Sequence, residues 1–259
     1  MDGLAEAVKR LNGATASSTT IKDLAGDKYS GERTEAVRRG EFACPLCSDL
    51  GYTVERVDGK IQYRECACWK RKRSLRLIEK SGLSEILDRC TLENYQTTEP
   101  WQANILHKAK DYIAGGGDKW FVITGTPGSG KTHICTAIAG AFIQAGKSVK
   151  YMLWRAEAPR LKALVNEREE YEAIMRTLQD VDLLYIDDFF KGSVKEADVN
   201  LAFEILNDRY NRMKPTVISG ERDIEELMEL DAAIASRIYE RSRGFCIRTP
   251  DGKNWRLRP

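Results

Sequence analysis

The strongest constraint in this sequence is the segment GTPGSGKT at residues 125–132. The apolar run 120–124 precedes it, and a helix-like pattern over 131–144, ended by Gly146, follows it. A glycine-rich loop between a strand and a helix is the Walker A pattern, whose backbone amides surround phosphate groups at the positive end of the helix. The alternative is a glycine-rich turn that matches by chance. The correct order of strand, loop and helix argues against that alternative.

The pattern gives each part of this loop a role. Its glycines adopt backbone angles that other residues avoid, so that amides turn towards the phosphates. Lys131 is placed to reach the outer phosphates, and the hydroxyl of Thr132 is placed to bind magnesium. ATP and Mg²⁺ are therefore the expected cofactors. The residues expected to hold them are Gly125, Thr126, Pro127, Gly128, Ser129, Gly130, Lys131 and Thr132.

Two consecutive aspartates end another apolar run, LLYIDD at residues 183–188. If this run is a neighbouring strand, its end lies beside the glycine-rich loop. We expect Asp187 to hold magnesium and Asp188 to orient or deprotonate the attacking water. The alternative is a strand cap with two solvated aspartates, which is less favoured beside a Walker A motif.

Short apolar runs alternate with helical patterns from residue 120 onward. This alternation predicts an α/β fold of the P-loop NTPase type, in which helices cover both faces of a parallel sheet. The expected strands are 120–124, 149–154, 181–186 and 216–219, with a closing hairpin of 245–248 and 255–257. The expected helices are 131–144, 156–177, 196–213, 224–230 and 232–241.

Four cysteines occur as two close pairs, Cys44 with Cys47 and Cys66 with Cys68. Residues 51–54 and 61–63 between the pairs have the pattern of two strands joined by the turn Asp58-Gly59. Two ligand pairs separated by a hairpin suit one tetrahedral zinc ion, and four thiolates leave no open position for catalysis. The alternative is four ordinary thiols. A metal would stabilise a module too small to form much of a core.

Composition limits the other classes of function. The 41 basic and 39 acidic residues nearly cancel, so net charge gives no argument for a nucleic-acid partner. Local basic runs such as 70–73 are the places to look for one. No apolar run is long enough to span a membrane, and the N-terminus lacks the apolar core of a secretory signal. We expect a cytoplasmic protein whose cysteines are thiols or metal ligands.

The chain is expected to have three parts. Residues 1–40 are polar and are expected to be flexible or partly helical. Residues 41–89 are expected to form a zinc-ribbon-like module that continues into a basic helix. Residues 90–259 are expected to form the ATPase core.

Five motifs together resemble one branch of the P-loop proteins. They are TLENY at 91–95, GTPGSGKT at 125–132, LLYIDDF at 183–189, KPTVIS at 214–219 and ASRI at 235–238. With these motifs the chain resembles the AAA+ ATPases, specifically the helicase loaders of the DnaC/DnaI type and their relatives, the IstB transposition ATPases. The resemblance covers about two thirds of the chain.

The resemblance implies further roles. AAA+ proteins place sensor 1, usually Asn or Thr, at the end of the strand that follows Pro215, where this chain has Glu221. That carboxylate would repel the γ-phosphate, and Ser219 is the neutral alternative. Arg237 matches the arginine finger that reaches the nucleotide of a neighbouring subunit, so a homo-oligomer is expected with ATP; the alternative is a surface arginine. Like these loaders, the chain is expected to lack the C-terminal helical lid.

The resemblance also implies a channel for single-stranded DNA after the second strand of the core. Arg155, Arg160 and Lys162 are the candidates for phosphate contacts, and Trp154 for stacking on a base. The alternative for Trp154 is packing in the core.

Three functions remain in competition. A helicase loader would bind a replicative hexameric helicase through the N-terminal module and single-stranded DNA through the core. An IstB-like transposition ATPase would bind DNA and recruit a transposase, but such chains generally lack the zinc-like module. A small metabolic kinase is disfavoured by Ser236-Arg237 and by the absence of an evident acceptor-binding lid.

Overall fold

The structure is a computed structural model that describes residues 44–255 except 45, 49, 58–59 and 253. The segment 1–40, the turn Asp58-Gly59 and the end of the expected closing hairpin lie outside the described residues. The described residues divide into two compact units, one that ends at Arg76 and one that begins at Leu77. This division falls earlier in the chain than the boundary at residue 89 suggested by the sequence.

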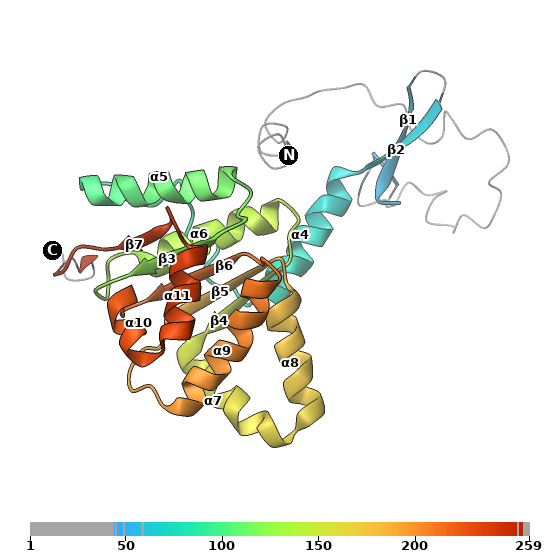
Figure 1. Ribbon diagram of the computed structural model, residues 1–259. Helices are drawn as coiled ribbons and strands as arrows, with labels where there is room; N and C mark the ends of the chain where they lie inside the picture. The colour runs from blue at the N-terminus through green and yellow to red at the C-terminus, as the bar shows by residue number, and fades with distance from the viewer. Residues whose placement is uncertain (1–43, 45, 49, 58–59, 253, 256–259) are drawn as a thin grey trace. The chain divides into compact units, whose positions relative to one another are not determined.

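The described part of the first unit is built on an antiparallel pair of strands (Figure 1). Strand β1, Tyr52–Val57, pairs with β2, Lys60–Glu65, in a register that sets Tyr52 opposite Glu65. Helix α4, Ala67–Ser81, begins directly after Cys66. The expected strands and the expected basic helix are therefore present.

The second unit contains a five-stranded sheet in which every pairing is parallel. The observed α/β fold confirms the expected class. The last strand pairs in parallel with the strand that precedes the glycine-rich loop, which was not expected. The hairpin expected of 245–248 with 255–257 lies partly outside the described residues and stays a prediction. Across the sheet the strands are β4 Val149–Leu153, β5 Leu183–Phe189, β6 Thr216–Gly220, β3 Trp120–Thr124 and β7 Cys246–Arg248.

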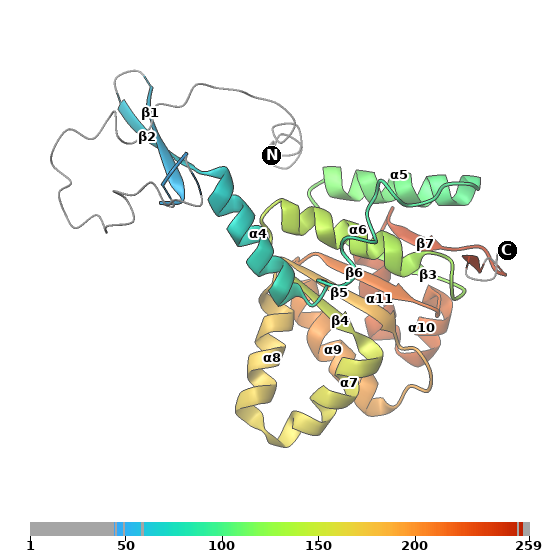
Figure 2. The same cartoon turned by 180° about the vertical axis from the view of Figure 1, so that it is seen from behind.

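Helices cover both faces of this sheet, as Figures 1 and 2 show from opposite sides. On one face lie α5 Pro100–Ala114 and α6 Lys131–Gln144. On the other face lie α7 Trp154–Ala163, α8 Arg168–Asp180, α9 Glu196–Asn211, α10 Ile224–Leu230 and α11 Ala232–Arg241.

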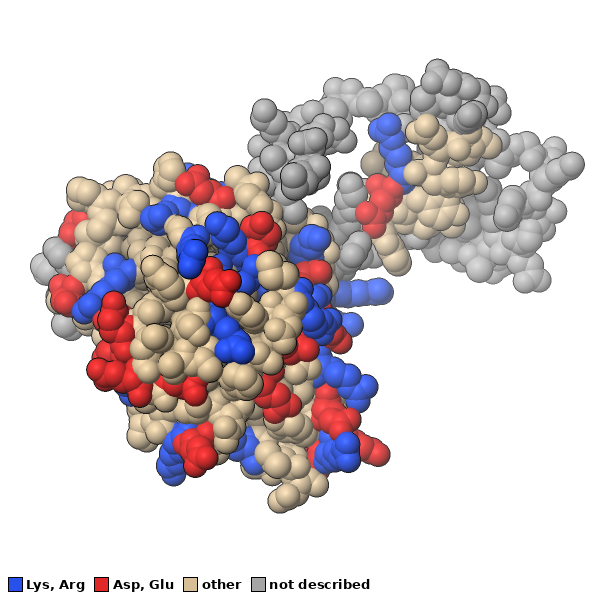
Figure 3. Space-filling model, viewed as in Figure 1, with Lys and Arg blue, Asp and Glu red and all other residues tan. Residues whose placement is uncertain are grey.

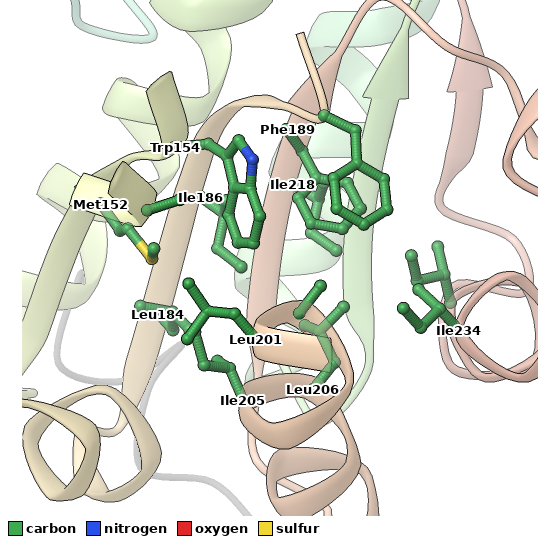
Figure 4. Packing of buried hydrophobic residues seen from close by; sticks show 14 of the residues in the cluster. Met152, Trp154, Leu184, Ile186, Phe189, Leu201, Ile205, Leu206, Ile218 and Ile234 are labelled. Atoms are coloured by element: carbon green, nitrogen blue, oxygen red, sulfur yellow. The ribbon is translucent and has the colours of Figure 1, made fainter. Parts of the chain in front are cut away.

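Alternate residues of each strand pack into separate cores, because successive side chains of a strand point to opposite faces. Phe121 and Ile123 of β3 pack towards α5 and α6, whereas Trp120 and Val122 pack towards the other face. Figure 4 shows part of this second core, in which side chains of β4, β5 and β6 meet those of α9.

Two helical predictions differ from the structure. The single helix expected over 156–177 is two helices, α7 and α8, separated by a 3₁₀ turn at Leu164–Asn166. Helix α5 was missed, although Pro100 at its first turn and the capping box of Glu99 with Gln102 are helix-start signals. Among the described residues, no helix combines the length and the apolar character needed to cross a membrane.

Candidate nucleotide-binding site

The glycine-rich loop joins β3 to α6 at the carboxyl edge of the parallel sheet, where ligands of such sheets bind. Two of its glycines are required by the geometry. Gly125 has φ +123°, and a Cβ there would lie 2.2 Å from Oγ1 of Thr249. Gly128 has φ +76°, and a Cβ there would lie 2.0 Å from Oδ1 of Asn254. The loop therefore keeps its open shape only with glycine at both positions.

The segment after β7 supports this loop. The backbone amide of Thr249 donates to the carbonyl oxygen of Thr124 at 2.8 Å, and its hydroxyl lies 3.1 Å from that of Ser129. The amide of Trp255 donates to the carbonyl oxygen of Gly128 at 2.8 Å. Sequence reasoning missed this contact, because nothing in the local pattern of 249–255 indicates which loop it will touch.

The ammonium group of Lys131 is folded back on the loop. Its Nζ donates to the carbonyl oxygens of Gly125 and Thr126 at 2.8 and 2.7 Å, and the residue is only 7% exposed. Burial lowers the pKa of Lys131, while the carboxylates of Glu221 and Asp188 act in the opposite direction. A phosphate is a stronger acceptor than a carbonyl oxygen, so these two contacts are the ones that it would replace.

The carboxylate of Asp187 is buried and collects three side-chain hydroxyls. Thr132 donates to Oδ1 at 3.3 Å, Tyr151 donates to Oδ2 at 3.2 Å, and Ser219 makes a short contact with Oδ1. A carboxylate beside a threonine hydroxyl is an oxygen donor set that suits Mg²⁺. Thr132 and Asp187 therefore fit the ion that they were expected to hold. Sequence reasoning did not identify Tyr151, since it lies on a different strand, β4.

Asp188 leaves the strand through a distorted backbone. Its φ is +53°, unusual for a residue other than glycine, and the pairing of β5 with β6 shifts register between Ile186 and Phe189. Asp188 lines the same cavity as the glycine-rich loop, where its two carboxylate oxygens each lie 3.3 Å from Nζ of Lys191. Strained backbone of this kind is concentrated at functional sites.

These groups open onto a cavity of about 810 Å³. The volume suits a nucleotide-sized ligand. Two buried hydroxyls of this region, those of Tyr95 and Thr126, have no hydrogen-bond partner among the described residues. Burial also raises the pKa of Tyr95 to about 12, so its hydroxyl is protonated at neutral pH. Besides loop residues 127–132, the wall includes Tyr95, Trp101, Asp188, Lys191, Glu221 and Trp255.

The two candidates for sensor 1 lie in different surroundings. Ser219 contacts the buried carboxylate of Asp187. Glu221 lines the cavity, and its Oε1 lies 2.9 Å from Nζ of Lys191. The carboxylate of Glu221 is therefore paired with the ammonium group of Lys191, a residue that sequence reasoning did not identify.

Arg237, the expected arginine finger, does not line the cavity of its own chain. It lies on α11, where its Nε donates to Oδ1 of Asn207 at 3.1 Å. Its guanidinium also lies over the rings of Phe203 and Tyr210, at 5.1 and 5.4 Å. The alternatives of a trans-acting finger and a surface arginine both remain compatible with this position.

The expected DNA-contacting residues are not gathered into one free surface. Trp154 is 4% exposed and packs against Phe189 and Phe190, with ring centres 5.1 and 5.3 Å apart (Figure 4). Core packing is therefore its observed role, and its indole is not accessible to a base. Arg160 and Lys162 form ion pairs with Glu170 and Asp198, and Arg155 is exposed.

The charge distribution agrees with the near-zero net charge. On the described part of the face drawn in Figure 3, basic and acidic side chains are interspersed. No single sign dominates that face, so it supplies no electrostatic argument for binding nucleic acid.

The four paired cysteines of the first unit come together. The Sγ atoms of Cys44, Cys47, Cys66 and Cys68 all lie within 4.8 Å of one another. Cys44 is 3.8 Å from Cys66, and Cys47 is 3.3 Å from Cys68. Four thiolates around one tetrahedral zinc ion are about 3.8 Å apart, given a Zn–S bond of about 2.3 Å. The cluster therefore fits the expected zinc site, with ligands at the start of α4 and in the turn before β1.

Comparison with known proteins gives the family. The family model described as "IstB-like ATP binding protein" matches residues 63–252. The chain belongs to this family of ATP-binding proteins. The match begins within β2 and spans α4 and the whole core sheet, so it includes both the second cysteine pair and the glycine-rich loop.

Several curated relatives share this region. An uncharacterized protein of Bacillus subtilis, YqaM, is 28% identical over 264 residues, covering 81% of this chain and 83% of its own length. The phage-like element PBSX protein XkdC of the same organism is 27% identical over 219 residues, covering 80% and 82%. The replicative helicase loader DnaC of Escherichia coli K12 is 28% identical over 171 residues, covering 65% and 69%.

Solved structures support the AAA+ fold. The crystal structure of DnaI matches with a TM-score of 0.52 and 23% identity, covering 64% of this chain and 92% of that one. The crystal structure of the DnaC helicase loader matches with a TM-score of 0.50 and 23% identity, covering 60% and 89%. The family and the fold together identify an AAA+ ATPase related to DnaC and leave no support for a small metabolic kinase.

Proposed function

We propose that this chain is an ATP-dependent loader that binds a replicative hexameric helicase and single-stranded DNA. The observation that carries the proposal is the presence, in one chain, of a nucleotide-sized cavity lined by the glycine-rich loop and a four-cysteine module ahead of it. Relatives that match over two thirds of their own length are named as replicative helicase loaders. Among our three hypotheses, only the loader makes use of both units.

In the proposed reaction the backbone amides of the glycine-rich loop bind the phosphates of ATP. Lys131 leaves the carbonyl oxygens of Gly125 and Thr126 and donates to the outer phosphates. Thr132 and Asp187 hold Mg²⁺, which when bound neutralises charge on the phosphate oxygens. Asp188 orients the attacking water and accepts its proton. Asp188 is paired with Lys191 in the present structure, so it must lose that partner before it can act as a base.

The first unit offers a surface for the helicase. Tyr52 of β1 and Tyr63 of β2 are diagonal neighbours whose rings meet edge-on with centres 5.6 Å apart, and Tyr63 is 69% exposed. Together with Trp69 they line a shallow hollow on this unit. Exposed aromatic side chains are enriched where proteins bind one another. We therefore assign helicase binding to this surface, and ATP-dependent contacts with DNA to the second unit.

The alternative is an IstB-like transposition ATPase that binds DNA and recruits a transposase. The description of the matching family model favours it. The two functions differ in partner and in the form of DNA that is bound. The transposition ATPase would bind a transposase and duplex DNA, whereas the loader would bind a helicase and single-stranded DNA.

Co-purification with a replicative hexameric helicase separates the two functions. The full-length chain is expected to bind the helicase, and Tyr63→Ala is expected to weaken binding while ATP affinity is unchanged. Lys60→Ala, on the same strand, is the matched control. Binding of duplex DNA in preference to single strands, with no helicase bound, would favour the transposition ATPase and overturn our assignment.

The nucleotide site has its own test. Lys131→Ala is expected to abolish tight ATP binding, because it removes the cation that reaches the outer phosphates. Asp188→Asn is expected to keep ATP affinity and slow turnover, because activation of water matters mainly in the transition state. Equilibrium titration measures the nucleotide affinity of the two variants, and a steady-state assay of phosphate release measures their turnover. Unchanged ATP affinity in Lys131→Ala would show that the site is wrongly assigned.

A further inference from the structure

Lys191 lies between two carboxylates at the edge of the nucleotide cavity. Its Nζ is 2.9 Å from Oε1 of Glu221 and 3.3 Å from both carboxylate oxygens of Asp188. Asp188 belongs to β5 and Glu221 follows β6, so the lysine joins the ends of two neighbouring strands. All three side chains line the cavity beside the glycine-rich loop, and about a third of each is exposed.

The turn that carries Lys191 is held in place from the same side. The amide of Lys191 donates to the carbonyl oxygen of Asp188 at 3.1 Å. The guanidinium of Arg222, the neighbour of Glu221, donates to the carbonyl oxygens of Phe190 at 3.1 Å and Gly192 at 2.8 Å. These contacts fix the backbone around Lys191 relative to Glu221. Its long flexible side chain remains the movable part.

The charges at this edge need a cation when a triphosphate binds. Asp188 and Glu221 both face the cavity, and two carboxylates beside a phosphate are mutually repulsive. Of the described residues that line the cavity, the lysines are Lys131 and Lys191. Lys131 approaches the outer phosphates from the glycine-rich loop, and a third cationic side chain of the lining, Arg89, donates to the carbonyl oxygen of Glu85 at 3.1 Å. Lys191 is the cation of this lining that contacts Asp188, the residue assigned to the attacking water.

We propose that Lys191, held by Glu221, binds the outermost phosphate of a nucleoside triphosphate and lets this site distinguish a triphosphate from a diphosphate. The proposal rests on the proposed ATPase function and adds to it the group that recognises the γ-phosphate. It also explains the acidic residue at the position where the family resemblance puts a neutral one: Glu221 serves to hold the lysine. The hydrogen bond with Glu221 raises the pKa of Lys191, so its ammonium group stays charged.

If the ion pair of Lys191 with Glu221 served only to stabilise the fold, the variants would bind nucleotides differently. A partly exposed ion pair of this kind contributes little to folding, and its loss would not distinguish one nucleotide from another. A third reading is that Lys191 only neutralises Glu221. In that case removing both charges together would leave the affinity for a triphosphate unchanged.

The test measures the affinity of the full-length chain for Mg²⁺ complexes of ADP and of a non-hydrolysable ATP analogue. Lys191→Ala is expected to weaken binding of the analogue about tenfold, the scale of one charge-assisted contact, and to change ADP binding less than about twofold. Lys195→Ala, in the same segment but outside the cavity lining, is the control and is expected to change neither. Thermal unfolding of each variant checks that the fold is kept.

The deciding comparison uses Glu221→Gln as the background. Adding Lys191→Ala to Glu221→Gln is again expected to weaken binding of the ATP analogue about tenfold. Equal affinity of Glu221→Gln and the double variant would overturn the proposal, as would an equal loss for ADP and the analogue in Lys191→Ala. Failure of the proposed ATPase function has a different signature: the wild-type chain would bind neither nucleotide, or Lys131→Ala would bind both normally.

Discussion

The Nε of Arg237 donates a 3.1 Å hydrogen bond to Oδ1 of Asn207 in the same chain. Its Nη1 also donates to the carbonyl oxygen of Ala233 at 2.8 Å, and its guanidinium lies over the rings of Phe203 and Tyr210. The group is thus held on the surface formed by α9 and α11, outside the cavity of its own chain. To act on ATP it must exchange these partners for the phosphate oxygens of a neighbouring subunit.

Arg237→Ala is therefore expected to bind ATP nearly normally as a monomer and to lose ATP-dependent oligomers. A guanidinium bridges two phosphate oxygens and remains charged, and one supplied in trans raises phosphoryl transfer by ~10³ or more. Turnover should fall by about that factor. Light scattering with ATP and single-stranded DNA measures the oligomer. The exposed Arg243, changed to alanine, is the control and should have little effect.

A mixture of Arg237→Ala with Lys131→Ala separates a trans finger from a structural arginine. Each variant alone should be inactive, whereas a mixed interface pairs an intact glycine-rich loop with an intact finger. Partial recovery of turnover is the expected result. Co-assembly without recovery would show that Arg237 does not act across the interface. Arg241 is a poor substitute, since it is buried and its guanidinium contacts the carbonyl oxygens of Asp118 and Met213.

Tyr151→Phe is expected to raise the Mg²⁺ concentration needed for half-maximal turnover by about tenfold. The hydroxyl of Tyr151 donates to Oδ2 of Asp187 and orients the carboxylate that we assign to the metal. Phenylalanine keeps the ring that packs against Tyr185. Turnover at saturating Mg²⁺ should change much less. Tyr171→Phe, which removes a hydroxyl bonded to Glu204, is the control. A uniform loss at all Mg²⁺ concentrations would contradict the orienting role.

The parts of the site that the sequence predicted are those encoded in one short segment. Residues 120–132 and 183–188 each carry a strand pattern and the functional side chains together, so their position at the sheet edge follows from parallel pairing. The four cysteines were predictable for the same reason, since their spacing matches a ligand set.

The parts that were missed depend on contacts between distant segments. Lys191 is a single lysine in a turn, and only the pairing of β5 with β6 brings it to Glu221. The segment around Trp255 supports Gly128 because β7 joins the sheet beside β3. Trp154 has the composition of a stacking residue, but Phe189 and Phe190 bury it. No local sequence pattern shows which distant segment each of these residues will contact.

Arg209 supplies a stability prediction for the second unit. It is fully buried, and its guanidinium donates to Thr216 and to the carbonyl oxygens of Leu178, Gln179, Val181 and Pro215. Burial lowers its pKa to about 10, which leaves it charged at neutral pH. It therefore joins the ends of α8, α9, β5 and β6 around one cation.

Arg209→Met is expected to lower the free energy of unfolding of this unit by about 3 kcal/mol, because several buried carbonyl oxygens lose their donor. Arg212→Met is the matched control. Arg212 is partly exposed and pairs with Asp180 and Asp208 in solvent, so its loss should cost much less than the loss of Arg209. Urea denaturation followed by circular dichroism measures both. Equal losses of unfolding free energy in the two variants would show that the buried contacts with carbonyl oxygens contribute no more to stability than the exposed ion pairs.

The final prediction concerns the metal of the first unit. We expect one zinc ion per chain, bound by Cys44, Cys47, Cys66 and Cys68, and its loss in Cys66→Ser/Cys68→Ser. The ion replaces protons on the thiols, so zinc affinity should fall as the pH falls. The amide of Cys47 lowers the pKa of Cys44 to about 7, which favours the thiolate form that binds zinc.

Zinc removal should unfold the first unit and leave the second unit folded. Among the described residues of the first unit, the buried cluster consists of cysteines, so we expect the metal to supply much of the folding free energy there. The second unit has two large cores of its own. Elemental analysis measures the zinc, and proteolysis of the chelated protein should cleave within 44–76 while nucleotide affinity stays unchanged. The matched control is Cys90→Ser, which removes a thiol outside the cluster and should keep the full zinc content. Full zinc content in the double variant, or loss of ATP binding on chelation, would contradict two separately stabilised units.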